Sequence, residues 1–185
     1  MLRRLALLVI AVVVAGCGGD SLSQPQTRID PAGVVKILPT PRGLDQSSDV
    51  TTVDAAELQA TLAGVAKAEA AKVYEEIGFA EGAMRTWSGA GGARVLAVVS
   101  RWRDHQTATN VGGGAVLRIA ETSGAAAWTP EALAGARGAR SADVRVLSFA
   151  VADLSLLVRG DGPVTDAAVI RTMDLLIRPV RAAAR

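Results

Sequence analysis

Few residues of this 185-residue chain could do chemistry, because it has one histidine and one cysteine. His105 follows Asp104, and two hydroxyl residues, Ser100 and Thr107, lie nearby in the sequence. A hydroxyl, an imidazole and a carboxylate make a hydrolytic triad when the imidazole orients the hydroxyl. No G-x-S-x-G nucleophile elbow is present, and Asp-His is an ordinary pair in the first turn of a surface helix. We therefore predict a protein that is not an enzyme, and keep a hydrolase built on Asp104-His105 as the less favoured alternative.

Three consecutive glycines, Gly112 to Gly114, follow Asn110-Val111 and raise the question of a phosphate cradle, since glycine lets backbone N–H groups approach an anion. A P-loop also needs Lys-Ser or Lys-Thr after its glycines, and a dinucleotide fingerprint has a different spacing. Each glycine costs a helix interior about 1 kcal/mol relative to alanine, so the three need a reason. We predict close packing of a helix on a sheet, or a break in that helix, and no cofactor. One histidine and one cysteine also predict no metal site.

The single cysteine, Cys17, ends an apolar run that begins after Arg3 and Arg4. The uncharged stretch from Leu5 to Gly16 is shorter than the ~20 residues that a transmembrane helix needs. With the cysteine, Val14-Ala15-Gly16 resembles the lipobox of bacterial lipoprotein precursors, in which the thiol is acylated and the chain is cut just before it. The resemblance implies a signal peptide over residues 1–16 and a lipid anchor at Cys17 on the extracytoplasmic side of the cell membrane. A secretory signal with a chance cysteine and a short N-terminal anchor helix remain the alternatives.

Removal of that signal changes the charge of the protein. The chain has 20 Lys and Arg against 18 Asp and Glu, and losing Arg3 and Arg4 leaves 18 against 18. A protein without net charge has no global field that attracts nucleic acid or anionic lipid. We therefore predict no nucleic-acid partner, and contact with the membrane through the anchor at Cys17.

Residues 17–53 contain four of the seven prolines and little apolar periodicity, which predicts a lipidated cysteine followed by a flexible Pro/Ser-rich tether. The apolar run from Val34 to Leu38 is the exception. We expect it to dock on the domain as an edge strand, with contact to a partner as the alternative.

Residues 54–185 are predicted to form a single α+β domain, because about 130 residues suffice for one core. Apolar periodicity and capping residues predict helices over 54–77, 104–121 and 165–180 and strands over 79–87, 93–102, 144–151 and 154–159. This order predicts a four-stranded antiparallel sheet made of two hairpin-helix units, packed against helices in the order αββαββα. Its core is expected to be single and to contain Leu62, Val98, Leu147, Leu156, Met173 and Leu176.

The lipobox, the proline-rich tether and the repeated hairpin-helix, with the motifs GFAEGAMRTW and TATNVGGGA, look like those of small actinobacterial lipoproteins. Some members of that group have a PsbP-like α/β/α fold. The resemblance covers most of the chain, but it brings no catalytic residue with it.

Trp87 lies beside the glycine-rich stretch 88–92, so we expect an exposed hairpin tip at which Trp87 and Arg94 contact a partner. A predicted mobile loop over 134–140 carries Arg137 and Arg140, a second small basic surface. The leading hypothesis is a membrane-anchored extracytoplasmic lipoprotein that acts as a non-enzymatic binding or interaction module. The alternatives are a carrier of an apolar envelope molecule, held in a pocket between sheet and helices, and the hydrolase named above.

Overall fold

The computed structural model describes residues 29–63 and 68–184. Cys17 and the predicted signal peptide lie outside the described residues. The described residues form five α-helices: α1 (Pro31–Lys36), α2 (Ala55–Ala63), α3 (Ala68–Glu76), α4 (His105–Ser123) and α5 (Asp166–Ala183). Four strands are long: β3 (Glu81–Ser88), β4 (Arg94–Arg101), β7 (Val144–Val151) and β8 (Leu154–Asp161). Four are short: β1 (Gln46–Ser47), β2 (Thr51–Val53), β5 (Ala126–Trp128) and β6 (Arg137–Arg140).

All of these strands form one antiparallel sheet of eight strands, in the order β1-β3-β4-β8-β7-β6-β5, with β2 also paired to β3. The α+β class fits, but the prediction of a four-stranded sheet in the order αββαββα is wrong. The four long strands correspond to the four predicted apolar runs. The short strands have two to four residues each, which is too few for an alternating pattern to stand out in the sequence.

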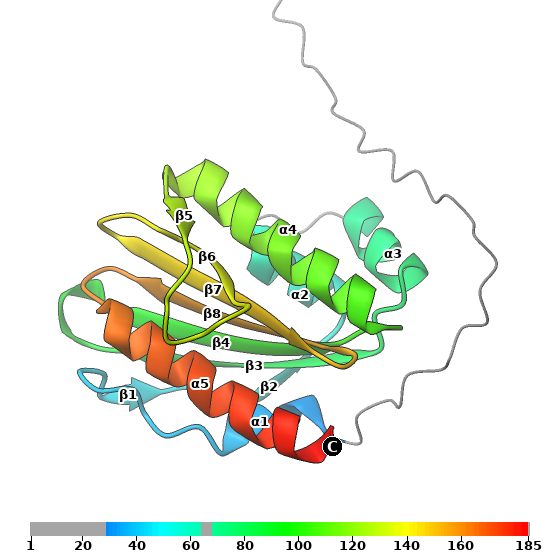
Figure 1. Cartoon of the computed structure of the whole chain (residues 1–185), viewed down its shortest axis with the longest axis horizontal. Coiled ribbons are helices and arrows are strands. Elements are labelled where there is room, and N and C mark those ends of the chain that lie inside the picture. Colours follow the sequence, from blue (N-terminus) through cyan, green and yellow to red (C-terminus); the bar gives the residue numbers. More distant parts are fainter. Residues whose placement is uncertain (1–28, 64–67, 185) are drawn as a thin grey trace, which may run out of the picture.

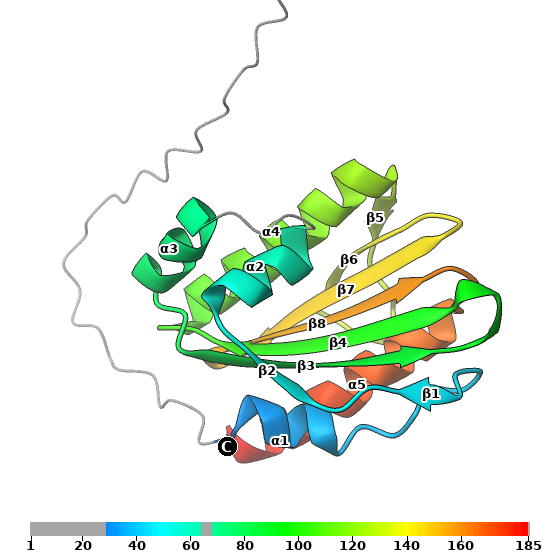
Figure 2. The same ribbon diagram turned by 180° about the vertical axis from the view of Figure 1, so that it is seen from behind.

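The sheet is covered on both faces (Figures 1 and 2). Helices α2, α3 and α4 lie on one face, whereas α1 and α5 lie on the other. Because successive residues of a strand point to opposite faces, the central strand β4 supplies Val95, Ala97 and Val99 to the α5 face and Leu96 and Val98 to the α4 face. Both faces of the long strands are therefore apolar.

The prediction of one core is wrong for the same reason, because the apolar side chains form two clusters separated by the sheet. All six predicted core residues are buried. Leu62 and Val98 belong to the α4 side, and the other four belong to the α5 side: Leu147, Leu156, Met173 and Leu176.

The described part of the predicted tether is folded onto the domain. Docking of Val34 to Leu38 was expected, but Val34 and Val35 lie in helix α1 instead of an edge strand. Asp30 starts this helix by accepting the backbone N–H groups of Ala32 and Gly33. Strands β1 and β2 then pair with β3, so the prediction of a flexible tether up to residue 53 is wrong from α1 onward.

Two other segments differ from their predicted form. The range 54–77 holds the two helices α2 and α3 in place of one. The range 137–140, predicted as a mobile loop, is strand β6, which is bonded on one side to β5 and on the other to β7. The backbone pairing decides this structure, because a Gly- and Arg-containing stretch has little strand propensity of its own.

Candidate ligand-binding groove

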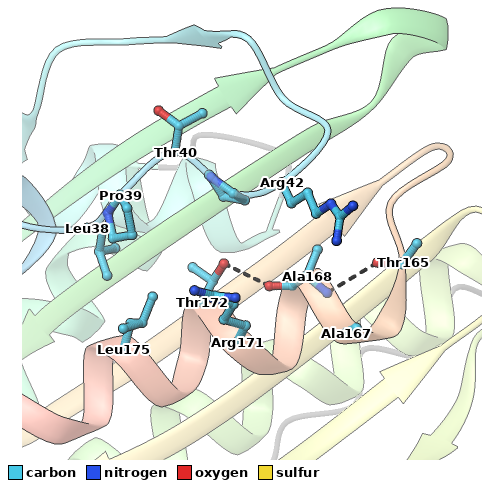
Figure 3. A pocket seen from close by; sticks show the side chains of 11 residues that line it. Leu38, Pro39, Thr40, Arg42, Thr165, Ala167, Ala168, Arg171, Thr172 and Leu175 are labelled. Carbon is cyan, nitrogen blue, oxygen red and sulfur yellow. Dashed lines mark hydrogen bonds between the residues drawn. The ribbon is translucent and has the colours of Figure 1, made fainter.

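A groove of about 530 Å³ lies on the α5 face of the molecule, between helix α5 and the segment 38–42 (Figure 3). We call this segment, Leu38-Pro39-Thr40-Pro41-Arg42, the proline strap. It connects α1 to β1, so it crosses the face that α5 covers only in part. The residues that line the groove are Leu38, Pro39, Thr40, Pro41 and Arg42 of the strap with Thr165, Ala167, Ala168, Arg171, Thr172 and Leu175 of the α5 region.

The start of the strap is fastened to the sheet by Arg85 of β3. One terminal nitrogen of its guanidinium, Nη1, donates to the carbonyl oxygens of Lys36 (3.2 Å) and Leu38 (3.0 Å), and Nε donates to Ser47 Oγ (2.9 Å). The Leu38 side chain is buried in the α5-side core. The two prolines that follow have no N–H to give to a strand ladder, which favours a strap that passes over the sheet without pairing to it.

The opposite wall is one stripe of α5. Thr165 caps the helix by accepting the backbone N–H of Ala168 at 3.2 Å. Positions 168, 171, 172 and 175 then follow helical spacing, so their side chains share the face that lines the groove. A neighbouring stripe is buried against the sheet: Val169, Met173, Leu176 and Val180.

The groove is mostly apolar along its walls, where proline, leucine and alanine side chains lie beside the buried Thr172. Arg42 and Arg171 are exposed and line the groove from opposite sides. In Figure 3 the guanidinium of Arg42 projects from the strap toward the first turns of α5. No acidic residue lines the groove, and within the described part of the chain neither arginine forms an ion pair. Mostly apolar walls with a few polar groups are common in pockets that bind small molecules.

Among the predicted contact residues, Trp87 differs most clearly from its expected position. Its side chain is 0% exposed and belongs to the α5-side core, with the Arg85 guanidinium 5.1 Å from the centroid of its ring. The glycines at the hairpin tip, Gly91 and Gly92, are exposed as expected. The prediction that Trp87 contacts a partner at that tip is therefore wrong, because the indole is packed in the core on the α5 face of the sheet.

The other predicted contact residues do not come together. Arg94 lines a separate cavity of about 240 Å³ on the α4 face, beside Arg159 and Asp161. Arg140 donates to Asp166 at 2.7 Å and stacks over Trp128. The guanidinium of Arg137 lies close to Gly113 of α4, on the α4 side of the sheet.

Asp166 also accepts a hydrogen bond from Arg145, so two arginines share one carboxylate. Burial alone would raise the pKa of Asp166, but the hydrogen bonds and charges of Arg145 and Arg140 outweigh it and lower the pKa. The positive surface predicted at residues 137–140 is therefore partly neutralised.

The Asp104-His105 pair has structural partners. Asp104 caps α4 by accepting the N–H of Thr107 at 2.7 Å, and this bond, with the nearby Arg103, holds the pKa of the carboxyl below its usual range. His105 Nδ1 lies 2.9 Å from the carbonyl oxygen of Ala152 and donates to it. That carbonyl belongs to the tight β7–β8 turn, where Ala152 adopts a left-handed φ of 49°. The contacts hold the start of α4 against this turn, and they give the hydrolase alternative no support.

The three glycines lie inside α4, which continues through them without a break. A Cβ on Gly112 would lie 2.1 Å from Ser148 Oγ and 2.8 Å from Ser155 Oγ. Close packing of the helix on the sheet, one of the two predicted reasons, is thus the reason for Gly112. Gly114 is exposed and has no heavy atom near its Cβ position, so no packing reason applies there.

The sequence did not lead us to predict the groove residues as a site. Two signals were present: the apolar run that includes Leu38, and a second periodic stripe on α5 beside the core-facing one. The two segments lie side by side on one face of the sheet, and no local pattern in the sequence indicates this.

In the described ranges, 29–63 and 68–184, no three His, Cys, Asp or Glu side chains are grouped as a metal site would require. No helix in those ranges has the length and apolar character to cross a membrane.

Comparison with protein-family models gives no match, and no curated protein matches the chain. Among solved structures, the chain is similar to the extracellular domain of PknH from Mycobacterium tuberculosis, with a TM-score of 0.46 and 11% sequence identity. The similarity covers 74% of this chain and 84% of that one.

Proposed function

We propose that the protein is a non-enzymatic binding module of the cell envelope that holds a small molecule in the groove between the proline strap and α5. The observation that supports this function is the groove itself. Its volume of about 530 Å³ falls within the roughly 300–1,000 Å³ of ligand pockets, and its mostly apolar lining carries few polar groups. The carrier hypothesis, previously an alternative, thus becomes the favoured form of the binding module.

We further propose that acylation of Cys17 holds the module at the extracytoplasmic face of the cell membrane. Ile29, the first described residue, is 12 positions after Cys17, so the chain between them can extend at most roughly 40 Å. The groove would therefore stay near the bilayer from which an apolar molecule is drawn. Two acyl groups or more give stable anchoring, which a single chain does not.

The anchor is tested by mass spectrometry of the mature N-terminus and by Cys17→Ala. We expect a lipidated Cys17 in the wild type and an unprocessed or released chain in the variant. A membrane-bound form with an unmodified Cys17 would contradict the anchor and leave the groove proposal untouched.

The groove is tested by filling it. The full chain is extracted with its membrane in native nanodiscs, and the small molecules that co-purify are compared by mass spectrometry with those of Ala168→Trp. Ala168 lies in the middle of the groove-lining stripe, so an indole there should remove the ligand. The matched control is Ala127→Trp on the exposed edge strand β5. A ligand retained equally by both variants, with thermal melts showing both folded, would rule out the groove as the binding site.

A further inference from the structure

The chemistry of the groove points to one class of occupant, and this inference rests on the function proposed above. We infer that the ligand is a free, single-chain amphiphile with an anionic head, a carboxylate or a phosphate monoester. Its head would lie between Arg42 and Arg171, and its alkyl chain along the proline strap.

The groove carries positive charge from two arginines, Arg42 and Arg171. Three other arginines near α5 have acidic partners: Arg178 bonds Asp174 of the same helix, and Arg140 and Arg145 share Asp166. Arg181, near the end of α5, stacks instead over the ring of Phe149. Arg171, between these groups on the helix, has no ion pair within the described chain, because the nearest acid on its helix, Asp174, is bonded to Arg178. Two guanidiniums without acidic partners line one groove and leave a positive charge there that an anion would balance.

The hydrogen-bond donors that line the groove fit an anionic group. A guanidinium presents a planar fork of N–H groups that matches the two oxygens of a carboxylate or a phosphate. Thr165 also lines the groove, and its Oγ accepts from the Ala168 N–H, which leaves the hydroxyl proton free to donate. Figure 3 shows Thr165 and the Arg42 guanidinium toward the same end of the groove. That end is where we place the head.

The end of the groove away from these donors is apolar. Leu38, Pro39 and Leu175 line the other end, where Figure 3 shows them across from one another. Apolar walls favour an alkyl chain at roughly 25 cal/mol per Å² of surface removed from water. A groove of about 530 Å³ has the size of a pocket for one drug-sized molecule, so we assign one chain in place of the two of a membrane phospholipid.

The test uses three photoreactive probes of one chain length on the full-length protein in its membrane: an alkyl carboxylic acid, an alkyl phosphate and an alkyl alcohol. Each carries a diazirine, and labelled peptides are identified by mass spectrometry. We expect the acid and the phosphate to label the strap and α5 at least tenfold more than the alcohol, because charged hydrogen bonds stabilise each anion.

The variant is Arg42→Gln/Arg171→Gln, which keeps polar side chains at the exposed rim and removes both charges. It should lower labelling by the acid and the phosphate about tenfold or more and leave labelling by the alcohol unchanged. The matched control is Arg118→Gln, an exposed arginine of α4 on the other face of the sheet, which should change none of the three.

Failures of the two proposals look different. Equal labelling of the groove by alcohol and acid, with no effect of the double variant, would overturn the anionic head and keep the groove as a binding site. Displacement of the acid probe by vesicles containing phosphatidic acid would overturn the single free chain. Acid labelling that falls outside the groove, or that Ala168→Trp does not reduce, would overturn the proposed function as well.

Discussion

The two faces of the sheet are built from the same strands but are closed differently. On the α4 face, α4 approaches the sheet so closely at Gly112 that a Cβ there would meet Ser148 and Ser155. On the α5 face, α5 covers the centre, and the remaining cover is α1 with the proline strap, beside which the groove opens. Both faces bury large apolar side chains, so the difference lies in the covering elements and not in the strands. A ligand site can therefore form on one side of a sheet whose two sides have similar apolar composition.

Each face contains one buried tryptophan, Trp87 on the α5 side and Trp102 on the α4 side, with exposures of 0% and 1%. Trp102 contacts Tyr74 and Phe79 edge-on. We expect Trp87→Ala and Trp102→Ala each to lower the free energy of unfolding by about 3–5 kcal/mol, measured by chemical denaturation. If Trp87→Ala left stability unchanged, the α5-side core would not contain this residue and the comparison of the faces would fail.

Replacing each tryptophan by phenylalanine tests how its indole N–H contributes to stability on each face. Trp102 Nε1 donates to Ser100 Oγ at 2.9 Å, whereas Trp87 Nε1 is buried and, within the described chain, has no hydrogen-bond partner. Trp102→Phe leaves Ser100 without its donor, while Trp87→Phe removes an unpaired N–H. We expect Trp102→Phe to be the more destabilising by about 1–3 kcal/mol in urea unfolding. Equal losses would indicate that the Trp87 N–H is bonded in solution.

Gly112 tests how tightly the α4 face is closed. Gly112→Ala adds a methyl group against Ser148 and Ser155, and the strain should exceed the gain of about 1 kcal/mol in helix propensity. We expect a net loss of about 1–2 kcal/mol in the free energy of unfolding. The matched control is Gly114→Ala, which has open space around its Cβ and should be stabilised by up to about 1 kcal/mol. A Gly112→Ala variant as stable as this control would show that the two serines can rotate away at no cost.

The smallest effect is expected at the start of α4. Asp104→Ala removes the cap and should cost about 1 kcal/mol at neutral pH. Because the folded-state pKa of Asp104 is lowered below its ordinary value of 3.8, this stabilisation is fully present above about pH 4 and is lost as the pH falls further. The stability difference between the wild-type and Asp104→Ala proteins should therefore narrow as the pH falls below the ordinary pKa of Asp104, while Asp104→Asn, which keeps a capping oxygen, should lack this pH dependence. A constant difference across that range would show that Asp104 does not act through its charge.

Sequence patterns correctly predicted the long strands and the helix starts, because these depend on local periodicity and on nearby capping residues. The apolar runs of β3, β4, β7 and β8 lie at the expected positions, and the predicted caps Asp104 and Thr165 start their helices. The sheet was predicted to be half its actual size because β1, β2, β5 and β6 are too short to show a pattern. They become strands only because a long neighbour offers them hydrogen bonds.

The candidate site was not predictable in the same way. Trp87 was placed at an exposed tip because it adjoins a glycine-rich stretch, but its side chain lies in the core on the face that α1 and α5 cover. The groove joins residues 38–42 to residues 165–175, segments more than 120 positions apart. No short-range pattern records which distant segment lies beside a helix.

The amino-acid sequence by itself therefore determined the long strands and the capped helices α4 and α5, since these follow from side-chain periodicity and from hydrogen bonds between near neighbours. Only the tertiary structure decided which face would be closed and which would hold a groove. That outcome depends on how closely each covering element can approach the sheet. Gly112 lets α4 approach to contact, while the proline strap crosses the α5 face without pairing to a strand.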